Sequence, residues 1–179
     1  MSEAAPELLD AEVGVRPADV GDAPGIARVH VRAWQAAYRG LLPDEHLDGL
    51  DVGARTQRWA GQLEAGPRPG GLVLVSGPPG EVLAFATAGP PRDDDVTGAE
   101  LYAIYVDPSA WRSGHGRALL EAVGDALPEG THELVLWVLA ANAPARAFYA
   151  AHGFEPDGQR KTVELGGARP EEVRYRRSL

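Results

Sequence analysis

Hydrophobic and polar residues repeat with two different periods along the chain, and these periods separate predicted strands from predicted helices. Apolar residues that alternate with polar ones predict strands, and an apolar stripe at i, i+3 and i+4 spacing predicts an amphipathic helix. Gly-Pro-Pro-Gly at positions 77–80 predicts a hairpin between two β-rich runs. The first half of the chain therefore predicts a strand over residues 13–16 and helices over residues 26–41 and 44–63. The hairpin joins predicted strands over residues 72–76 and 81–88.

The second half has sharper boundaries. Pro128 ends one helical pattern, Gly153 stands at the C-terminal cap of another, and residues 89–98 read as a loop. The pattern predicts helices over residues 114–127 and 144–152. It predicts strands over residues 100–106, 132–139, 154–165 and 172–177. This order predicts one mixed α/β sheet with helices on both faces.

Composition limits the class of protein. The 179 residues carry 17 basic and 26 acidic side chains, a formal charge of −9, which argues against nucleic acid as a partner. The chain has no cysteine, which excludes cysteine nucleophiles and thiolate metal sites. Residues 1–10 have neither a basic start nor an apolar run, so we expect a flexible tail on a single domain over residues 1–179, and a soluble cytoplasmic protein without a membrane partner.

The segment after residue 106 has the features of a phosphate site. A strand ends at Pro108, a short loop carries Arg112, Gly114 and Gly116, and a helix follows at once. The free N–H groups of a helix start attract anions, and glycines let a phosphate approach the backbone. A tight strand-to-helix turn is the alternative interpretation. Leu119 stands where a dinucleotide fingerprint would have its third glycine.

A second segment carries Asn142, then Phe148-Tyr149, then Gly153-Phe154. Together the two segments resemble the Gcn5-related N-acetyltransferase (GNAT) superfamily, whose acyl-CoA site combines a Val-x-Pro strand end, an Arg/Gln-x-x-Gly-x-Gly/Ala loop and an Asn…Phe-Tyr…Gly-Phe segment. The resemblance covers about residues 99–158. Trp111 stands where the family usually has Arg or Gln, and the arginine is displaced to Arg112.

The resemblance implies a fold and a co-substrate. The fold is a mixed, mostly antiparallel sheet of about seven strands with helices on both faces, splayed where acetyl-CoA binds. The backbone of Ile104 and Val106 would hold the pantetheine arm, and Asn142 would contact the co-substrate unless it only caps a helix. The diphosphate would lie on the loop residues Arg112, Ser113, Gly114, His115, Gly116 and Arg117.

Two residues are candidates for proton transfer. Tyr149 lies where the family often has a tyrosine that protonates the departing thiolate, and its alternative is a packed core aromatic. Glu100 is the candidate base for the amine, because strand alternation would place it on one face with Ile104 and Val106. Its alternative is a solvated strand end.

Trp34 and Tyr38 are candidates for the acceptor pocket, with helix-to-sheet packing as the alternative. His30 is expected to be buried and hydrogen-bonded. The histidines show no metal-ligand spacing, so no metal site is expected. The aspartates at 93–95 are expected to form a solvated loop.

We therefore expect an enzyme that moves acetyl from acetyl-CoA to the primary amine of a small molecule or peptide, by direct attack in a ternary complex. The alternative is a noncatalytic acyl-CoA-binding regulatory module with the same fold. The apolar last strand suggests a homodimer.

Overall fold

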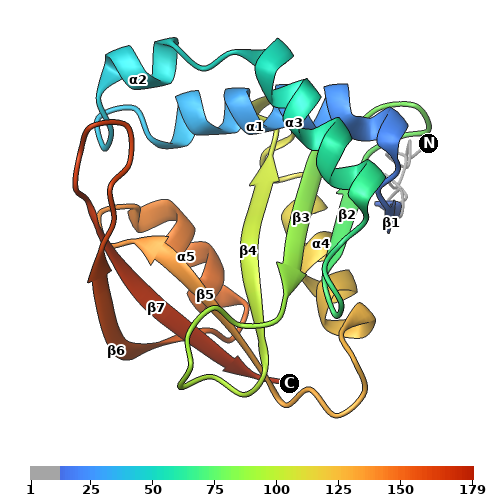
Figure 1. Cartoon of the computed structure of the whole chain (residues 1–179). Coiled ribbons are helices and arrows are strands. Elements are labelled where there is room, and N and C mark those ends of the chain that lie inside the picture. Colours follow the sequence, from blue (N-terminus) through green and yellow to red (C-terminus); the bar gives the residue numbers. More distant parts are fainter. Residues whose placement is uncertain (1–12) are drawn as a thin grey trace, which may run out of the picture.

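The computed structural model describes residues 13–179, so the tail expected over residues 1–10 lies outside the described residues (Figure 1). The strands are β1 (Val15–Pro17), β2 (Leu72–Ser76), β3 (Ala84–Gly89), β4 (Ala99–Val106), β5 (Glu133–Leu139), β6 (Glu155–Thr162) and β7 (Glu171–Ser178). The α-helices are α1 (Ala23–Ala37), α2 (Asp44–Asp48), α3 (Val52–Ala65), α4 (His115–Ala126) and α5 (Ala143–Ala151). The single-domain assignment stays a prediction.

The strands form one seven-stranded sheet in the order β1-β2-β3-β4-β5-β7-β6. All neighbours are antiparallel except β4 and β5, which are parallel. The predicted mixed sheet of about seven strands with helices on both faces is confirmed. Within residues 13–179, no helix is long and apolar enough to cross a membrane.

Local signals explain where the helices begin and end. A reciprocal capping box between Asp19 and Asp22 starts the turn before α1, and proline stands in the first turn of α1 and α5. The predicted helix over 26–41 ends early, at Ala37, because the chain turns at Tyr38 and Gly40 then takes a φ of +80°. The other predicted boundaries agree with the structure to within three residues.

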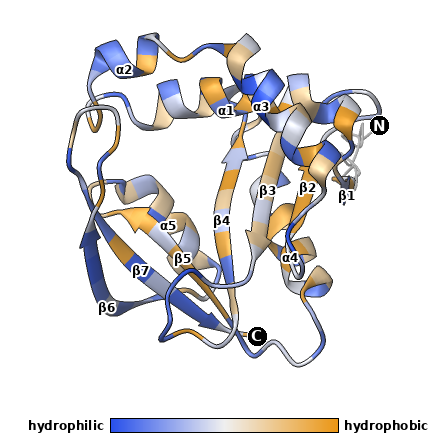
Figure 2. Cartoon of the chain, viewed as in Figure 1, coloured by the Kyte–Doolittle hydropathy of each residue, from blue (hydrophilic) through white to orange (hydrophobic). Residues whose placement is uncertain are grey.

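Each face of the sheet packs its own hydrophobic core, so the sheet is covered on both sides (Figure 2). The larger core packs Leu119, Leu120 and Val123 of α4 against β3, β4, β5 and β7. The smaller core packs Ile26 and Val29 of α1 against Phe85 of β3. These sides are called the α4–α5 face and the α1–α3 face below.

The central parallel pair separates after a short contact. β4 pairs with β5 only through Ala99, Glu100 and Leu101, whereas β5 pairs with β7 along its whole length. Residues 102–106 of β4 therefore have no strand partner on the side of β5. We call this divergence the splay; it matches the expected splayed sheet.

A β-bulge lies at the start of the splay. Leu101 pairs with Ala88 and Ala103 with Thr87, so Tyr102 is the extra residue. Leu101, Ile104 and Val106 pack on the α4–α5 face, while Tyr105 packs in the core of the α1–α3 face. The bulge thus reverses the alternation, and the expectation that Glu100 shares a face with Ile104 and Val106 is wrong.

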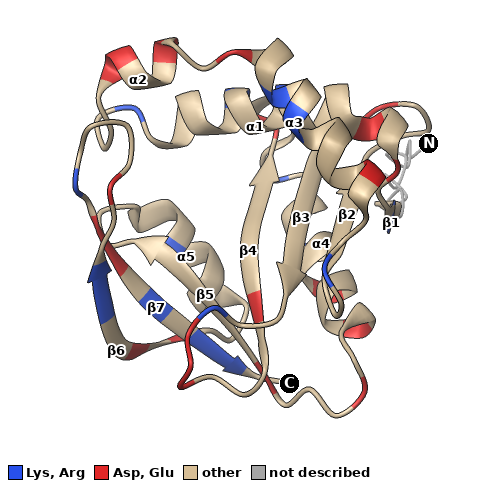
Figure 3. Cartoon of the chain, viewed as in Figure 1, with Lys and Arg blue, Asp and Glu red and all other residues tan. Residues whose placement is uncertain are grey.

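The loop between β3 and β4 is fastened to the other half of the sheet (Figures 1 and 3). Arg174 of β7 is 3% exposed and donates to Asp93, Asp95 and Asp157. Asp93 also accepts a hydrogen bond from the indole of Trp137 in β5. Asp94 and Asp95 are exposed, as expected for a solvated loop, but Asp93 and Asp95 are also bound by Arg174, which was not expected. We call this loop with its partners the clasp.

The last strand is interior to the sheet, because β7 lies between β5 and β6. Both of its edges are paired, so it has no free edge to extend the sheet to a second copy. The homodimer stays a prediction without this support.

Candidate active site

The loop between β4 and α4 is shaped for close approach to its backbone. Gly114 caps α4 with a φ of +85°, and Arg112 takes a φ of +63°, a conformation uncommon for a side chain with a Cβ. A Cβ at Gly116 would lie 3.3 Å from two ring atoms of Phe148, so the ring of α5 packs directly on this glycine. The first helical hydrogen bond after the loop is from Ala118 N–H to the Gly114 carbonyl, which leaves the preceding N–H groups for a ligand.

The side chains of this loop have different partners. Arg112 and Ser113 are exposed. Arg117 forms a surface ion pair with Glu121 at 2.8 Å. His115 points inward, where its Nδ1 lies 2.8 Å from Ser76 Oγ and burial lowers its pKa. The imidazole of His115 therefore faces Ser76 of β2 rather than the backbone of the loop.

The splayed edge of β4 presents backbone groups. The Asp107 N–H donates to the Leu83 carbonyl, toward β3. Because backbone groups alternate sides along a strand, those of Ile104 and Val106 point the other way, into the splay. The Val106 carbonyl accepts a hydrogen bond from the indole of Trp111 at 2.9 Å, so Trp111 ties the loop to the end of β4.

Tyr149 of α5 is half-buried beside the splay. Its ring makes edge contacts with Phe148 and Phe154, with centroids 5.4 and 5.8 Å apart. Burial, and then the nearby Tyr105, raise the pKa of its phenol above the ordinary value of 10. Among residues 13–179 the hydroxyl has no hydrogen-bond partner, so it is protonated at neutral pH and available to a ligand.

Asn142 caps α5. Its Oδ1 accepts from Ala145 N–H at 3.2 Å, and the residue is 7% exposed. Asn142 therefore acts as the helix cap that was the alternative interpretation, and its contact with a co-substrate stays a prediction.

Glu100 lies at the paired end of β4, away from the splayed edge. Its side chain is fully buried and accepts hydrogen bonds from Arg92 N–H at 2.9 Å and Arg92 Nε at 3.0 Å, and it forms a salt bridge with the same guanidinium. The carboxylate thus binds Arg92 of the β3–β4 loop. The alternative interpretation of Glu100 as a solvated strand end is therefore also wrong.

Aromatic side chains of α1 and β4 gather on the α1–α3 face. Trp34 and Tyr38 are in edge contact at 5.2 Å, and the hydroxyls of Tyr38 and Tyr105 lie 3.5 Å apart. Burial first, and then Tyr105, raise the pKa of Tyr38 well above its usual value. The imidazole of His30 stacks on Tyr105 at 5.2 Å. The two expected acceptor residues therefore share one aromatic cluster, at the splayed end of β4.

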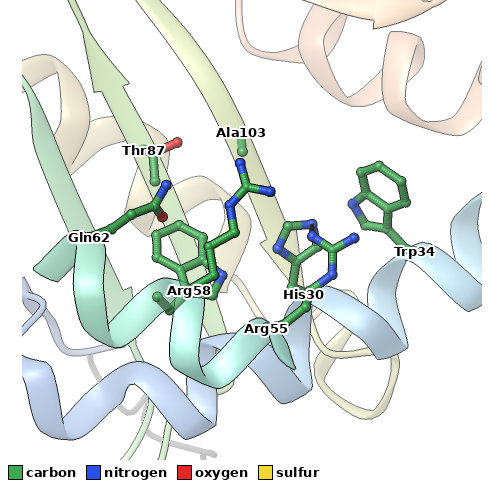
Figure 4. A pocket seen from close by; sticks show the side chains of 8 residues that line it. His30, Trp34, Arg55, Arg58, Gln62, Thr87 and Ala103 are labelled. Carbon is green, nitrogen blue, oxygen red and sulfur yellow. Dashed lines mark hydrogen bonds between the residues drawn. The ribbon is translucent and has the colours of Figure 1, made fainter. Parts of the chain in front are cut away.

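Two arginines of α3 complete this side, and the sequence analysis missed them (Figure 4). A cavity of about 190 Å³ is lined by His30, Trp34, Arg55, Arg58, Trp59, Gln62, Thr87 and Ala103. His30 is half-buried rather than buried, and its Nε2 accepts the expected hydrogen bond, from Arg55 Nη1 at 3.2 Å. Its pKa falls to about 3, first through burial and then through the two arginines. The i, i+3 and i+4 spacing of Arg55, Arg58 and Trp59 indicated a shared helix face, but not which element it covers.

Within residues 13–179, no group of three or more His, Cys, Asp or Glu side chains is arranged to hold a metal ion.

Comparisons with known proteins give consistent matches. The profile described as "Acetyltransferase (GNAT) family" matches residues 31–154. A protein of Bacillus subtilis named uncharacterized N-acetyltransferase YuaI is 32% identical over 163 residues, 90% of each chain. A probable N-acetyltransferase of Mycobacterium tuberculosis, Rv2775, is 26% identical over 94% of this chain and 95% of its own. The crystal structure of PaiA N-acetyltransferase from Thermoplasma acidophilum, in complex with coenzyme A, superposes with a TM-score of 0.70 at 15% identity, over 94% of this chain and 99% of that one, which shows the shared fold.

Proposed function

Because the chain belongs to the GNAT family and is an acetyl-CoA-dependent N-acetyltransferase, we propose that it transfers acetyl to a primary amine by direct attack within a ternary complex. The absence of cysteine supports this route, since no acyl-cysteine intermediate can form. The observation that carries the proposal is the splay, where unpaired backbone groups of β4, the loop before α4 and the free hydroxyl of Tyr149 meet.

The β4–α4 loop fits acetyl-CoA. The backbone N–H groups of residues 114–117 would bind the diphosphate, and Gly116 lets the Phe148 ring pack closely against the loop that holds them. Arg112 and Ser113, both exposed, would contact the phosphates from the rim. The free edge at Ile104 and Val106 would hold the pantetheine arm, with Asn142 near its end. Bound there, acetyl-CoA supplies an acetyl group activated as a thioester.

Tyr149 is proposed as the general acid. Its phenol stays protonated at neutral pH and its hydroxyl has no partner among the described residues, so it can donate a proton to the leaving sulfur. The backbone N–H groups at the splayed edge would stabilise the thioester oxygen as charge develops on it.

Glu100 is proposed as a positioning residue rather than the base. Its buried carboxylate holds Arg92 and with it the β3–β4 loop, and it is on the opposite face from Ile104. We assign removal of the amine proton to water in the splay, with Trp34 and Tyr38 forming the wall against which the acceptor lies.

Thiol release from acetyl-CoA, measured with pooled amines against a no-amine control, tests the proposal. Release in at least one pool is expected. If every pool is flat while the protein still binds acetyl-CoA, measured by calorimetry, the noncatalytic binding module becomes the better account.

A further inference from the structure

The cavity beside Trp34 is lined by hydrogen-bond donors and has no acidic side chain. Because His30 Nε2 accepts from Arg55, the proton of its neutral imidazole is on Nδ1. That Nδ1 and the indole Nε1 of Trp34 are both buried without a hydrogen-bond partner among residues 13–179. Buried donors without partners cost free energy, so this wall of the cavity is rich in donors and poor in acceptors.

Arg55 and Arg58 add positive charge that no carboxylate balances. Some buried or partly buried contacts elsewhere pair an arginine with carboxylates, for example Arg92 with Glu100 and Arg174 with three aspartates. Within residues 13–179, neither Arg55 nor Arg58 forms a salt bridge. Arg55 is half-buried over the Trp34 ring, 5.3 Å from its centroid, and burial followed by Arg58 lowers its pKa. An anion beside Arg55 and Arg58 would relieve this destabilised charge.

The cavity reaches β4 one residue before its proposed pantetheine-binding edge. Ala103, which lines it, directly precedes Ile104 on β4, and Tyr105 stacks on His30. A group seated among the arginines is therefore within a few atoms of the splayed edge. The volume of about 190 Å³ is below the usual range of about 300–1,000 Å³ for sites that enclose a whole ligand, so it fits one small group of a molecule that extends into the splay.

We propose that this cavity, formed by Arg55, Arg58, His30 and Trp34, binds an anionic group of the acceptor, so that the amine substrates are small molecules that carry a carboxylate or a phosphoryl group beside the amine. This inference rests on the proposed function and deepens it. It runs against the net charge of −9, which by long-range attraction alone would favour cationic acceptors.

Matched acceptor pairs test the charge requirement. Alanine is compared with alaninamide, and phosphoethanolamine with ethanolamine, by thiol release from acetyl-CoA. The anionic member of at least one pair is expected to have a kcat/KM at least about tenfold higher, and the pair that shows the preference identifies carboxylate or phosphoryl as the group. Equal or better turnover of both neutral members overturns the inference while leaving the proposed function intact.

Three variants locate the effect. Arg55→Gln and Arg58→Gln are expected to raise the KM for the anionic acceptor about tenfold or more and to leave the KM for acetyl-CoA unchanged. Arg160→Gln removes the same charge from β6, where Arg160 pairs with Glu171, and is expected to keep the parent preference. A preference that survives in both α3 variants overturns the inference.

A binding readout decides the matter if no amine is acetylated. Inorganic phosphate and acetate are titrated against the parent and the α3 variants, with the thermal midpoint and tryptophan fluorescence as readouts, since Trp34 and Trp59 line the cavity. Stabilisation and a fluorescence change in the parent, lost in both variants, support the anion site even though the proposed function has failed. No response of the parent to either anion overturns it.

Discussion

The two faces of the splay are built from different chemical groups. On the α4–α5 face, the groups available to a ligand are mainly backbone N–H groups of one continuous segment, residues 104–117. On the α1–α3 face they are side chains, Arg55, Arg58, His30 and Trp34, brought together from two helices. A site made of backbone groups depends on the glycines and the path of the chain, so proteins with different side chains can bind the same co-substrate. A side-chain site changes with each substitution, and this is where acceptor choice can diverge without a change of fold.

Tyr149→Phe tests the point where the two faces meet and has the largest expected effect. Loss of the phenol should lower kcat about 100-fold and leave the KM for acetyl-CoA within about twofold. The thermal midpoint should hold, because the hydroxyl bonds no described residue. Tyr175→Phe is the control, since its hydroxyl accepts from Arg146 at 3.0 Å and its loss should cost stability rather than rate. An unchanged kcat in Tyr149→Phe contradicts the acid role.

The α1–α3 face should give the protein a pH-dependent stability. Folded His30 has a pKa of about 3, below the unfolded value near 6.5, so between these values the unfolded chain binds more protons. Stability is therefore complete above pH 6.5 and falls by about 2 kcal/mol by pH 5. Urea unfolding at both pH values measures this loss.

His30→Gln should remove most of this loss of stability between pH 6.5 and pH 5. The smaller contribution of buried His115, which acts in the same direction, should persist. The full loss in the variant would assign the titration to another group.

Gly116→Ala tests the α4–α5 face alone. A Cβ 3.3 Å from the Phe148 ring would shift that ring against the loop, so the KM for acetyl-CoA should rise about tenfold while the anionic preference of the acceptor site stays. Gly124→Ala, in the same helix, places its Cβ 3.5 Å from the flexible end of Arg177 and should leave the KM unchanged. Equal KM values in the two variants would show that the loop does not depend on this close contact.

Glu100→Gln has the smallest expected effect on the rate. Both carboxylate oxygens accept from Arg92, and the amide keeps only one acceptor and loses the charge, so the free energy of unfolding should fall by about 3 kcal/mol while the pH–rate profile should not move. A shift of the acidic limb of that profile would return Glu100 to the role of base.

The sequence predicted what is local in the chain. Gly114 and Gly116 directly follow a predicted strand, and Asn142 and Tyr149 lie in one short segment. The sequence pattern alone therefore predicted the sheet, the loop and the family. The errors came from tertiary structure. The bulge at Tyr102 reversed the face of Glu100, and the aspartates of the β3–β4 loop found a buried arginine 79 to 81 residues away in β7. The bulge leaves no periodic signal in the sequence, and the helical spacing of Arg55, Arg58 and Trp59 does not show which element their face covers.

The clasp lies at the closed end of the splay. It ties the loop that leads into β4 to Trp137 and Arg174 on the far half of the sheet, beside the three residues where β4 and β5 still pair. The two halves of the sheet are thus joined where β4 and β5 pair, and they diverge toward the other end of these strands. The width of the splay at Ile104 and Val106 is therefore measured from an end that the aspartates and Arg174 hold closed.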